Sequence, residues 1–185
     1  MSRGSIISFH GGCFVGGSVE WDKKQNNELT KLGFDVYQVN FPKTNKMFTL
    51  WARTFDFTKM QQPIFCIGRS SGGYLAKVFS SFHPTKIKRT IYICPVFNPL
   101  NRIKVYKQFS SKTKDFFGNT APISTKSHNI EKELIMLAKN DRNVPLSCFT
   151  REQISGAKFL GPSTHTGMLT TTSKKFLDKV DMFFI

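Results

Sequence analysis

The sequence contains no apolar run of the length that a membrane-spanning helix requires. It also lacks a signal-peptide pattern, because "MSRG" is followed by "SIISFHGG", a short strand-like run that leads directly into glycines. Cysteine is scarce: there are 4 in 185 residues, and none forms a C-x-x-C pair. A spanning helix and a disulfide framework are therefore excluded, and we expect a cytoplasmic protein with reduced thiols.

Acidic residues are also few, with 12 Asp and Glu against 27 Lys and Arg, which gives a formal net charge of +15. A positive field of this size attracts anions such as phosphorylated substrates, nucleic acid or acidic membrane surfaces. The basic residues are dispersed, however, and the one dense patch, at 102–114, has no nucleic-acid-binding motif beside it. We expect no specific nucleic-acid partner, while weak association with anionic surfaces stays open as an accessory property.

Strand-like and helix-like patterns alternate along the chain. Apolar runs bounded by glycine, proline or polar residues predict strands at 6–9, 34–41, 64–67, 87–96, 134–138 and 157–160. Apolar residues at helical spacing predict helices at 18–32, around 48–55, in the segment after the serines with its apolar face at 74–82, and at 174–184. Strands separated by helices imply right-handed βαβ units, so we expect one α/β domain over 1–185, with a mostly parallel sheet of about six strands and helices on both faces.

The first helical pattern, at 18–32, allows its faces to be assigned. Trp21 and Leu29 share one side, which we expect to point toward the core. Asp22 is expected on the solvent-facing side, and Gly33 stands where a glycine commonly ends a helix.

The alternating pattern fails at 98–130, a basic stretch that contains proline, glycine and several serines and threonines. This stretch is too long for an ordinary connection. We expect a lid or cap insertion there, with a disordered loop as the alternative. Four aromatic residues in it are candidates to line an acyl pocket: Tyr106, Phe109, Phe116 and Phe117.

The segment "FCIGRSSGGYLAKVF", 65–79, places the pattern G-x-S-x-G between a strand and a helix. Such an elbow presents its central residue, Ser70, at the apex of a tight bend. Gly68 and Gly72 are needed because strand and helix approach closely there, and the Ser71 N–H at the helix start is placed to meet an oxyanion. The alternative is a glycine-rich, phosphate-binding turn, but neither a Walker nor a Rossmann glycine pattern occurs.

A second glycine-rich segment, "SFHGGCFVGG", directly follows the first predicted strand. Its His10-Gly11-Gly12-Cys13 resembles the HGGG oxyanion loop of the α/β-hydrolase superfamily, particularly the carboxylesterase and hormone-sensitive-lipase branch. The segment from Gly68 to Gly73 looks like the nucleophile elbow of the same superfamily. The resemblance implies an α/β-hydrolase fold, reduced because the usual first antiparallel strands are missing.

The resemblance also implies roles for the residues of this loop. The N–H groups of Gly12 and Cys13 would join that of Ser71 in an oxyanion hole, with Cys13 standing where the family has a third glycine. His10 and Gly11 would be structural at the site, His10 through a hydrogen bond that holds the loop.

A nucleophilic serine needs a base and an acid. Among the four histidines, His165 follows the last predicted strand and precedes the last helix, whereas His83 ends a helix and His128 falls in the insertion. Asp141 comes directly after the strand at 134–138, so the chain order is serine, aspartate, histidine, as in this superfamily. The alternatives are a surface loop for His165 and a turn-forming role for Asp141.

These residues together predict a serine hydrolase that cleaves a carboxylic ester through Ser70, Asp141, His165 and an acyl-enzyme. No metal or organic cofactor is expected. The substrate is expected to be a small ester or acyl compound, with an anionic group as an option. The open alternatives are a thioesterase, lipase or acyltransferase with the same triad, or a non-catalytic hydrolase-fold binding protein with a basic surface.

Overall fold

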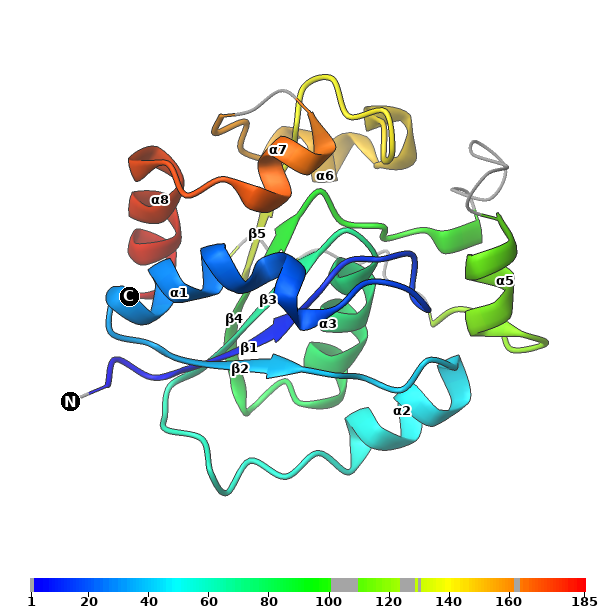
Figure 1. The fold of residues 1–185 in the computed structure, drawn as a ribbon, viewed down its shortest axis with the longest axis horizontal. Coiled ribbons are helices and arrows are strands. Elements are labelled where there is room, and N and C mark those ends of the chain that lie inside the picture. Colours follow the sequence, from blue (N-terminus) through cyan, green and yellow to red (C-terminus); the bar gives the residue numbers. More distant parts are fainter. Residues whose placement is uncertain (1, 101–109, 124–128, 130, 162–163) are drawn as a thin grey trace.

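The structure is a computed structural model that describes residues 2–100, 110–123, 129, 131–161 and 164–185. A parallel sheet of five strands runs through its centre in the order β2-β1-β3-β4-β5 (Figure 1). The strands are β1 (Ser5–Phe9), β2 (Asp35–Val39), β3 (Ile64–Arg69), β4 (Ile87–Ile93) and β5 (Glu133–Met136). Every adjacent pair is parallel, which confirms the predicted α/β architecture.

Helices lie on both faces of this sheet. They are η1 (Val19–Asp22), α1 (Lys23–Lys31), α2 (Asn45–Arg53), α3 (Ser71–Phe82), α5 (Ser110–Phe117), η3 (Leu146–Cys148), α6 (Arg151–Gly156), α7 (His165–Thr170) and α8 (Lys174–Phe184). Among the residues that the structure describes, every helix is too short or too polar to span a bilayer.

Alternating side chains of the strands build a separate core on each face. On β1, Ile7 and Phe9 point into the core beneath α2 and α3, whereas Ile6 points into the core beneath α1 and α8. Successive strand residues point to opposite faces, so a fully buried strand supplies both cores. All five residues of β1 are buried, so both faces of this strand are covered.

Three predicted elements differ from the structure. The sixth strand, at 157–160, is reduced to one parallel bridge between Lys158 and Met136, because Ala157 still caps α6. The strand predicted to reach Val96 ends at Ile93, since Cys94 has a φ of 44° that no strand accommodates.

The first predicted helix is the other difference. It consists of a 3-10 turn followed by α1, and its face assignment was wrong for two residues. Trp21 is 63% exposed and Asp22 is 5% exposed, the reverse of the expected arrangement. The turn rotates both side chains away from the positions that a continuous helix would give them.

Phe79 of α3 lies at the centre of the core beneath α2 and α3. Its ring centroid is 5.4 Å from that of Phe9, 5.7 Å from that of Trp51 and 5.1 Å from that of Phe55. This side chain therefore connects strand, helix and loop aromatics in one cluster.

Replacing Phe79 with alanine should lower the free energy of unfolding by about 3–5 kcal/mol, because the buried ring would leave a cavity among aromatic neighbours. Leu50→Ala is the control, since Leu50 is 65% exposed and its loss should cost less than about 0.5 kcal/mol. Urea denaturation measures both, and equal effects would contradict this account of the core.

Candidate active site

Ser70 occupies the bend between β3 and α3 in a strained backbone conformation. Its φ is 53° and its ψ is −121°, a region that residues with a side chain rarely adopt. A Cβ at Gly72 would lie 2.4 Å from the Phe9 carbonyl oxygen, so only glycine fits where α3 meets β1. The geometry is that of a nucleophile elbow, which presents the serine side chain at the carboxyl end of β3.

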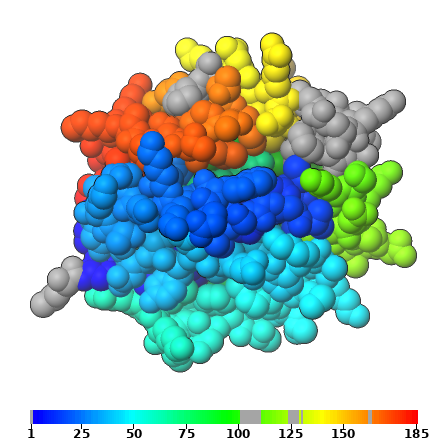
Figure 2. Space-filling view, viewed as in Figure 1, coloured from blue at the N-terminus to red at the C-terminus, as the bar shows by residue number. Residues whose placement is uncertain are grey.

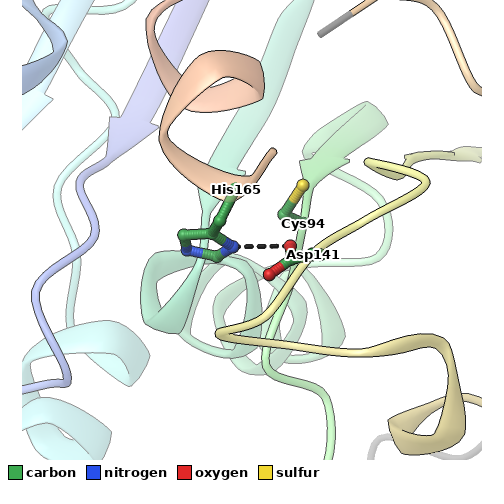
Figure 3. Close-up of side chains that lie close together, drawn as sticks. All are labelled: Cys94, Asp141 and His165. Carbon is green, nitrogen blue, oxygen red and sulfur yellow. Dashed lines mark hydrogen bonds and ion pairs between the residues drawn. The ribbon is translucent and has the colours of Figure 1, made fainter. Parts of the chain in front are cut away.

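The structure brings the three predicted triad residues together. The distance from His165 Nε2 to Ser70 Oγ is 3.1 Å, and that from His165 Nδ1 to Asp141 Oδ2 is 2.6 Å. All three residues are buried, and Figure 3 shows the imidazole of His165 facing the carboxylate of Asp141. His165 begins α7, where Thr164 caps the helix by accepting from the Gly167 N–H. An imidazole bonded on both sides can move a proton at Nε2 while its Nδ1–H is held.

Asp141 forms a turn and bonds the histidine at the same time. Its Oδ1 accepts from the N–H groups of Asn143 and Val144, both at 2.8 Å, while Oδ2 accepts from His165. Burial alone would raise the pKa of Asp141, but the hydrogen bond and charge of His165 and the two N–H donors hold the pKa below its usual value. The carboxylate is therefore kept ionised. The sequence offered two interpretations of Asp141, a bond to the histidine and a turn-forming role, and its side chain makes the contacts of both.

Cys94 lies beside this pair, and the three side chains form the one group among the described residues that could hold a metal ion (Figure 3). Their ligand atoms lie within 4.8 Å of one another. Two ligands of a tetrahedral zinc ion stand roughly 3.3 Å apart, whereas the His165 and Asp141 atoms are 2.6 Å apart. Burial and the nearby Asp141 charge also raise the pKa of the Cys94 thiol. The spacing fits a hydrogen bond better than a metal site.

The glycine loop after β1 holds three consecutive residues with positive φ, at 117° for Gly12, 57° for Cys13 and 74° for Phe14. The Gly16 N–H donates to the Gly12 carbonyl at 2.8 Å, which closes the loop. Phe14 is fully buried and stacks on Phe116 with ring centroids 5.0 Å apart. The buried ring anchors the loop and offsets the cost of the left-handed backbone.

His10 is the first residue of this loop, and Ser71 is the first residue of α3. His10 Nδ1 donates to the Gly11 carbonyl at 2.6 Å, and burial lowers the pKa of His10. At the helix start, the Ser71 N–H has no acceptor inside the helix. The expected hydrogen bond of His10 is present, and the Ser71 N–H lies at the helix start as predicted.

A cavity of about 500 Å³ opens onto the triad; we call it the site cavity. Gly12, Cys13, Ser70 and His165 line it together with Trp21 of η1. Figure 2 shows the N-terminal segments in blue meeting the C-terminal segments in orange on one face of the molecule. The cavity is thus built by loops from opposite ends of the chain, at the carboxyl edge of the sheet.

The part of the 98–130 segment that the structure describes does not line the site cavity with its phenylalanines. Phe116 and Phe117 are 1% and 6% exposed and belong to the core, so the expectation that they line an acyl pocket was wrong for these two. Tyr106, Phe109 and His128 lie outside the described residues.

Sequence reasoning missed Arg69, the residue before Ser70. Its guanidinium is completely buried and reaches across to α1 and η1. It donates to Gln25 Oε1 at 2.6 Å, to Ser8 Oγ at 2.8 Å and to Asn26 Oδ1 at 2.9 Å. It also pairs with Asp22 Oδ2 at 3.4 Å. A clue was present in the sequence, because Asp22 and Asn26 are spaced to share a helix face and an arginine follows the buried strand at 64–67.

Asp22 depends on this arginine for its charge balance. Burial raises the pKa of Asp22, and the Arg69 charge counteracts that rise. Asp22 also lines the site cavity, so Arg69 connects the nucleophile elbow to one cavity wall.

Replacing Arg69 with methionine should lower the free energy of unfolding by about 3–5 kcal/mol, because the Asp22 carboxylate would be left buried without its cation. Asp22→Asn in the same chain should restore part of this loss. Urea denaturation of the parent, both single variants and the double variant gives the coupling, which we expect to exceed about 1 kcal/mol. Strict additivity of the two changes would contradict the pairing.

Comparisons with known proteins bear on the fold. The chain matches no protein-family model, and no curated protein is similar to it in sequence. Solved structures are similar to it. An extracellular α/β-hydrolase from a Paenibacillus species has a TM-score of 0.64 and 16% identity, with 96% of this chain and 97% of the other covered.

Two further structures are similar over most of the chain. Polyneuridine aldehyde esterase has a TM-score of 0.63 and 12% identity, with coverages of 97% and 99%. A fungal esterase from Rhizomucor miehei has a TM-score of 0.66 and 20% identity, with coverages of 100% and 73%. The superfamily branch stays a prediction at these identities, whereas the predicted fold class is confirmed: this chain has a reduced form of the α/β-hydrolase fold.

Proposed function

We propose that this protein is a serine hydrolase that cleaves a small carboxylic ester through an acyl-enzyme on Ser70. The observation that carries the proposal is the position of His165, bonded to Ser70 Oγ on one side and to the Asp141 carboxylate on the other. Three residues separated by 95 and 24 positions in the sequence form one chain of hydrogen bonds. A structural role alone does not require this alignment next to a cavity.

The first half of the reaction follows from these contacts. Ser70 Oγ attacks the ester carbonyl carbon, and its proton passes to His165 Nε2 as the new C–O bond forms. The carbonyl electron pair moves to the oxygen and gives a tetrahedral oxyanion. Asp141 holds the Nδ1–H side of the ring and stabilises the imidazolium that results. His165 then protonates the leaving alcohol, and the acyl group remains on Ser70.

The oxyanion is the charge that the protein must stabilise. We assign its donors to the N–H groups of Gly12, Cys13 and Ser71, two from the cavity-lining loop and one from the start of α3. Donors that are held in place before reaction need no rearrangement when the charge develops. A water molecule, deprotonated at His165 Nε2, then attacks the acyl carbon and gives a second oxyanion of the same kind. This intermediate collapses as the bond from the acyl carbon to Ser70 Oγ breaks, His165 returns the proton to Oγ, and the acid leaves.

The fold supports hydrolysis as the reaction class, since two of the similar structures are esterases and a third is described as a hydrolase. A thioester or an acyl transfer to another alcohol would use the same groups. Rates on oxygen esters and thioesters of matched acyl length distinguish these outcomes.

Replacing Ser70 with alanine should lower kcat/KM for a short 4-nitrophenyl ester by roughly ten-thousandfold or more, because the attacking oxygen is removed. The variant should also lose labelling by a fluorophosphonate, which reacts with an activated serine. Ser155→Ala, an exposed serine of α6, is the control and should retain both activities. Ester hydrolysis that survives in Ser70→Ala would refute the proposed function.

Replacing Gly12 with alanine should lower kcat by about 10²–10³-fold while KM changes little, because the loop would lose the geometry that supplies an oxyanion donor. A Cβ at Gly12 would lie 2.4 Å from the Gly16 carbonyl oxygen, and the φ of 117° disfavours any side chain. Gly161→Ala is the matched control, since a Cβ there meets nothing within 4 Å. Circular dichroism checks that the variant is folded. An unchanged kcat in the folded variant would contradict the assignment of the Gly12 N–H as an oxyanion donor.

A further inference from the structure

The charged side chains around the candidate site leave an excess of positive charge. Two cavities adjoin His165: the site cavity and a neighbouring one of about 420 Å³, which Arg142 and Asn143 also line. Among the described residues that line these cavities, Asp22 is the one carboxylate, and it is paired with Arg69. The two remaining charged side chains, Lys112 and Arg142, are both cations.

Lys112 is placed to act on a bound molecule. It projects from α5 into the lining of the site cavity, and its Nζ lies 3.8 Å from the position that a Cβ of Gly16 would occupy. Within the part of the chain that the structure describes, no carboxylate or carbonyl pairs with this ammonium group. An ammonium group above a glycine loop, with no acceptor of its own, attracts a negative group on a ligand.

We propose that the site cavity selects esters that carry a carboxylate or another anionic group, and that Lys112 binds this group. This inference rests on the proposed function and deepens it, because it names the substrate class of the same site. The paired state of Asp22 is essential to it, since an unpaired carboxylate on the cavity wall would repel such a substrate. The overall charge of +15 acts in the same direction by attracting anionic molecules to the surface.

The test compares matched esters that differ in one charge. For an anionic acyl chain, mono-(4-nitrophenyl) adipate is compared with its methyl ester. For an anionic leaving group, 4-acetoxybenzoate is compared with its methyl ester. The measured quantity is the ratio of kcat/KM for the anionic member to that for the neutral member, and the parent protein should favour the anionic member of at least one pair.

Lys112→Gln should lower this ratio about threefold for that pair, the size of effect expected when an exposed ion pair is lost. Lys112→Arg should retain the ratio because it retains the charge. Lys114→Gln is the matched control: it removes the same charge from the same helix at a residue that does not line the site cavity. Added salt should reduce the preference of the parent protein by screening.

Two outcomes overturn the inference: a ratio that Lys112→Gln leaves unchanged in both pairs, or one that Lys114→Gln lowers equally. Hydrolysis of the neutral esters shows separately whether the proposed function holds. A second measurement of the charge preference needs no turnover. It is the ratio of the rates at which two fluorophosphonates label Ser70, one with a terminal carboxylate and one with the methyl ester of that carboxylate. No labelling and no hydrolysis would reject the proposed function itself.

Discussion

The strained backbone of Ser70 is the constraint on which the candidate site depends. Its positive φ persists only because neighbouring elements hold the residue from both sides. Toward β4, the Ser70 N–H donates to the Ile93 carbonyl and the Ser70 carbonyl accepts from the Val96 N–H, each at 2.9 Å. Toward α1, the adjoining Arg69 is held by four polar side chains. The hydroxyl is thereby fixed at the point that His165 reaches.

The need to hold the bend at Ser70 on its α1 side explains why the charged Arg69 is buried so close to the proposed chemistry. An isolated guanidinium in the core would be costly, but Arg69 is bonded at all three of its nitrogens. Its partners come from β1, η1 and α1, so one side chain joins the elbow to the N-terminal segments. Since Asp22 and Trp21 of η1 also line the site cavity, the same network sets the position of the cavity wall.

Much of the site could be predicted because its residues stand at the ends of strands that the sequence marks clearly. The order serine, aspartate, histidine and the carboxyl edge of a parallel sheet were enough to bring Ser70, Asp141 and His165 together. The errors concern residues whose environment is set by tertiary contacts. Asp22 was assigned to solvent because its partner, Arg69, is distant in the sequence. The phenylalanines of α5 were assigned to a pocket because the pattern gives no sign that Phe14 stacks on Phe116.

Buried, partnered side chains and an exposed cation have different proposed roles in this protein. Two carboxylates beside the site have partners: Asp141 accepts from His165 Nδ1 at 2.6 Å, and Asp22 pairs with Arg69 at 3.4 Å. Because both carboxylates are buried beside these partners, ions in the solvent screen these interactions only weakly. Lys112, for which the described part of the chain provides no acceptor, is exposed at the lining of the site cavity, where salt screening and the charge of a ligand act directly on it. In the proposed scheme, the chemistry would thus depend on the buried, partnered groups, whereas selection of the substrate would depend on the exposed Lys112.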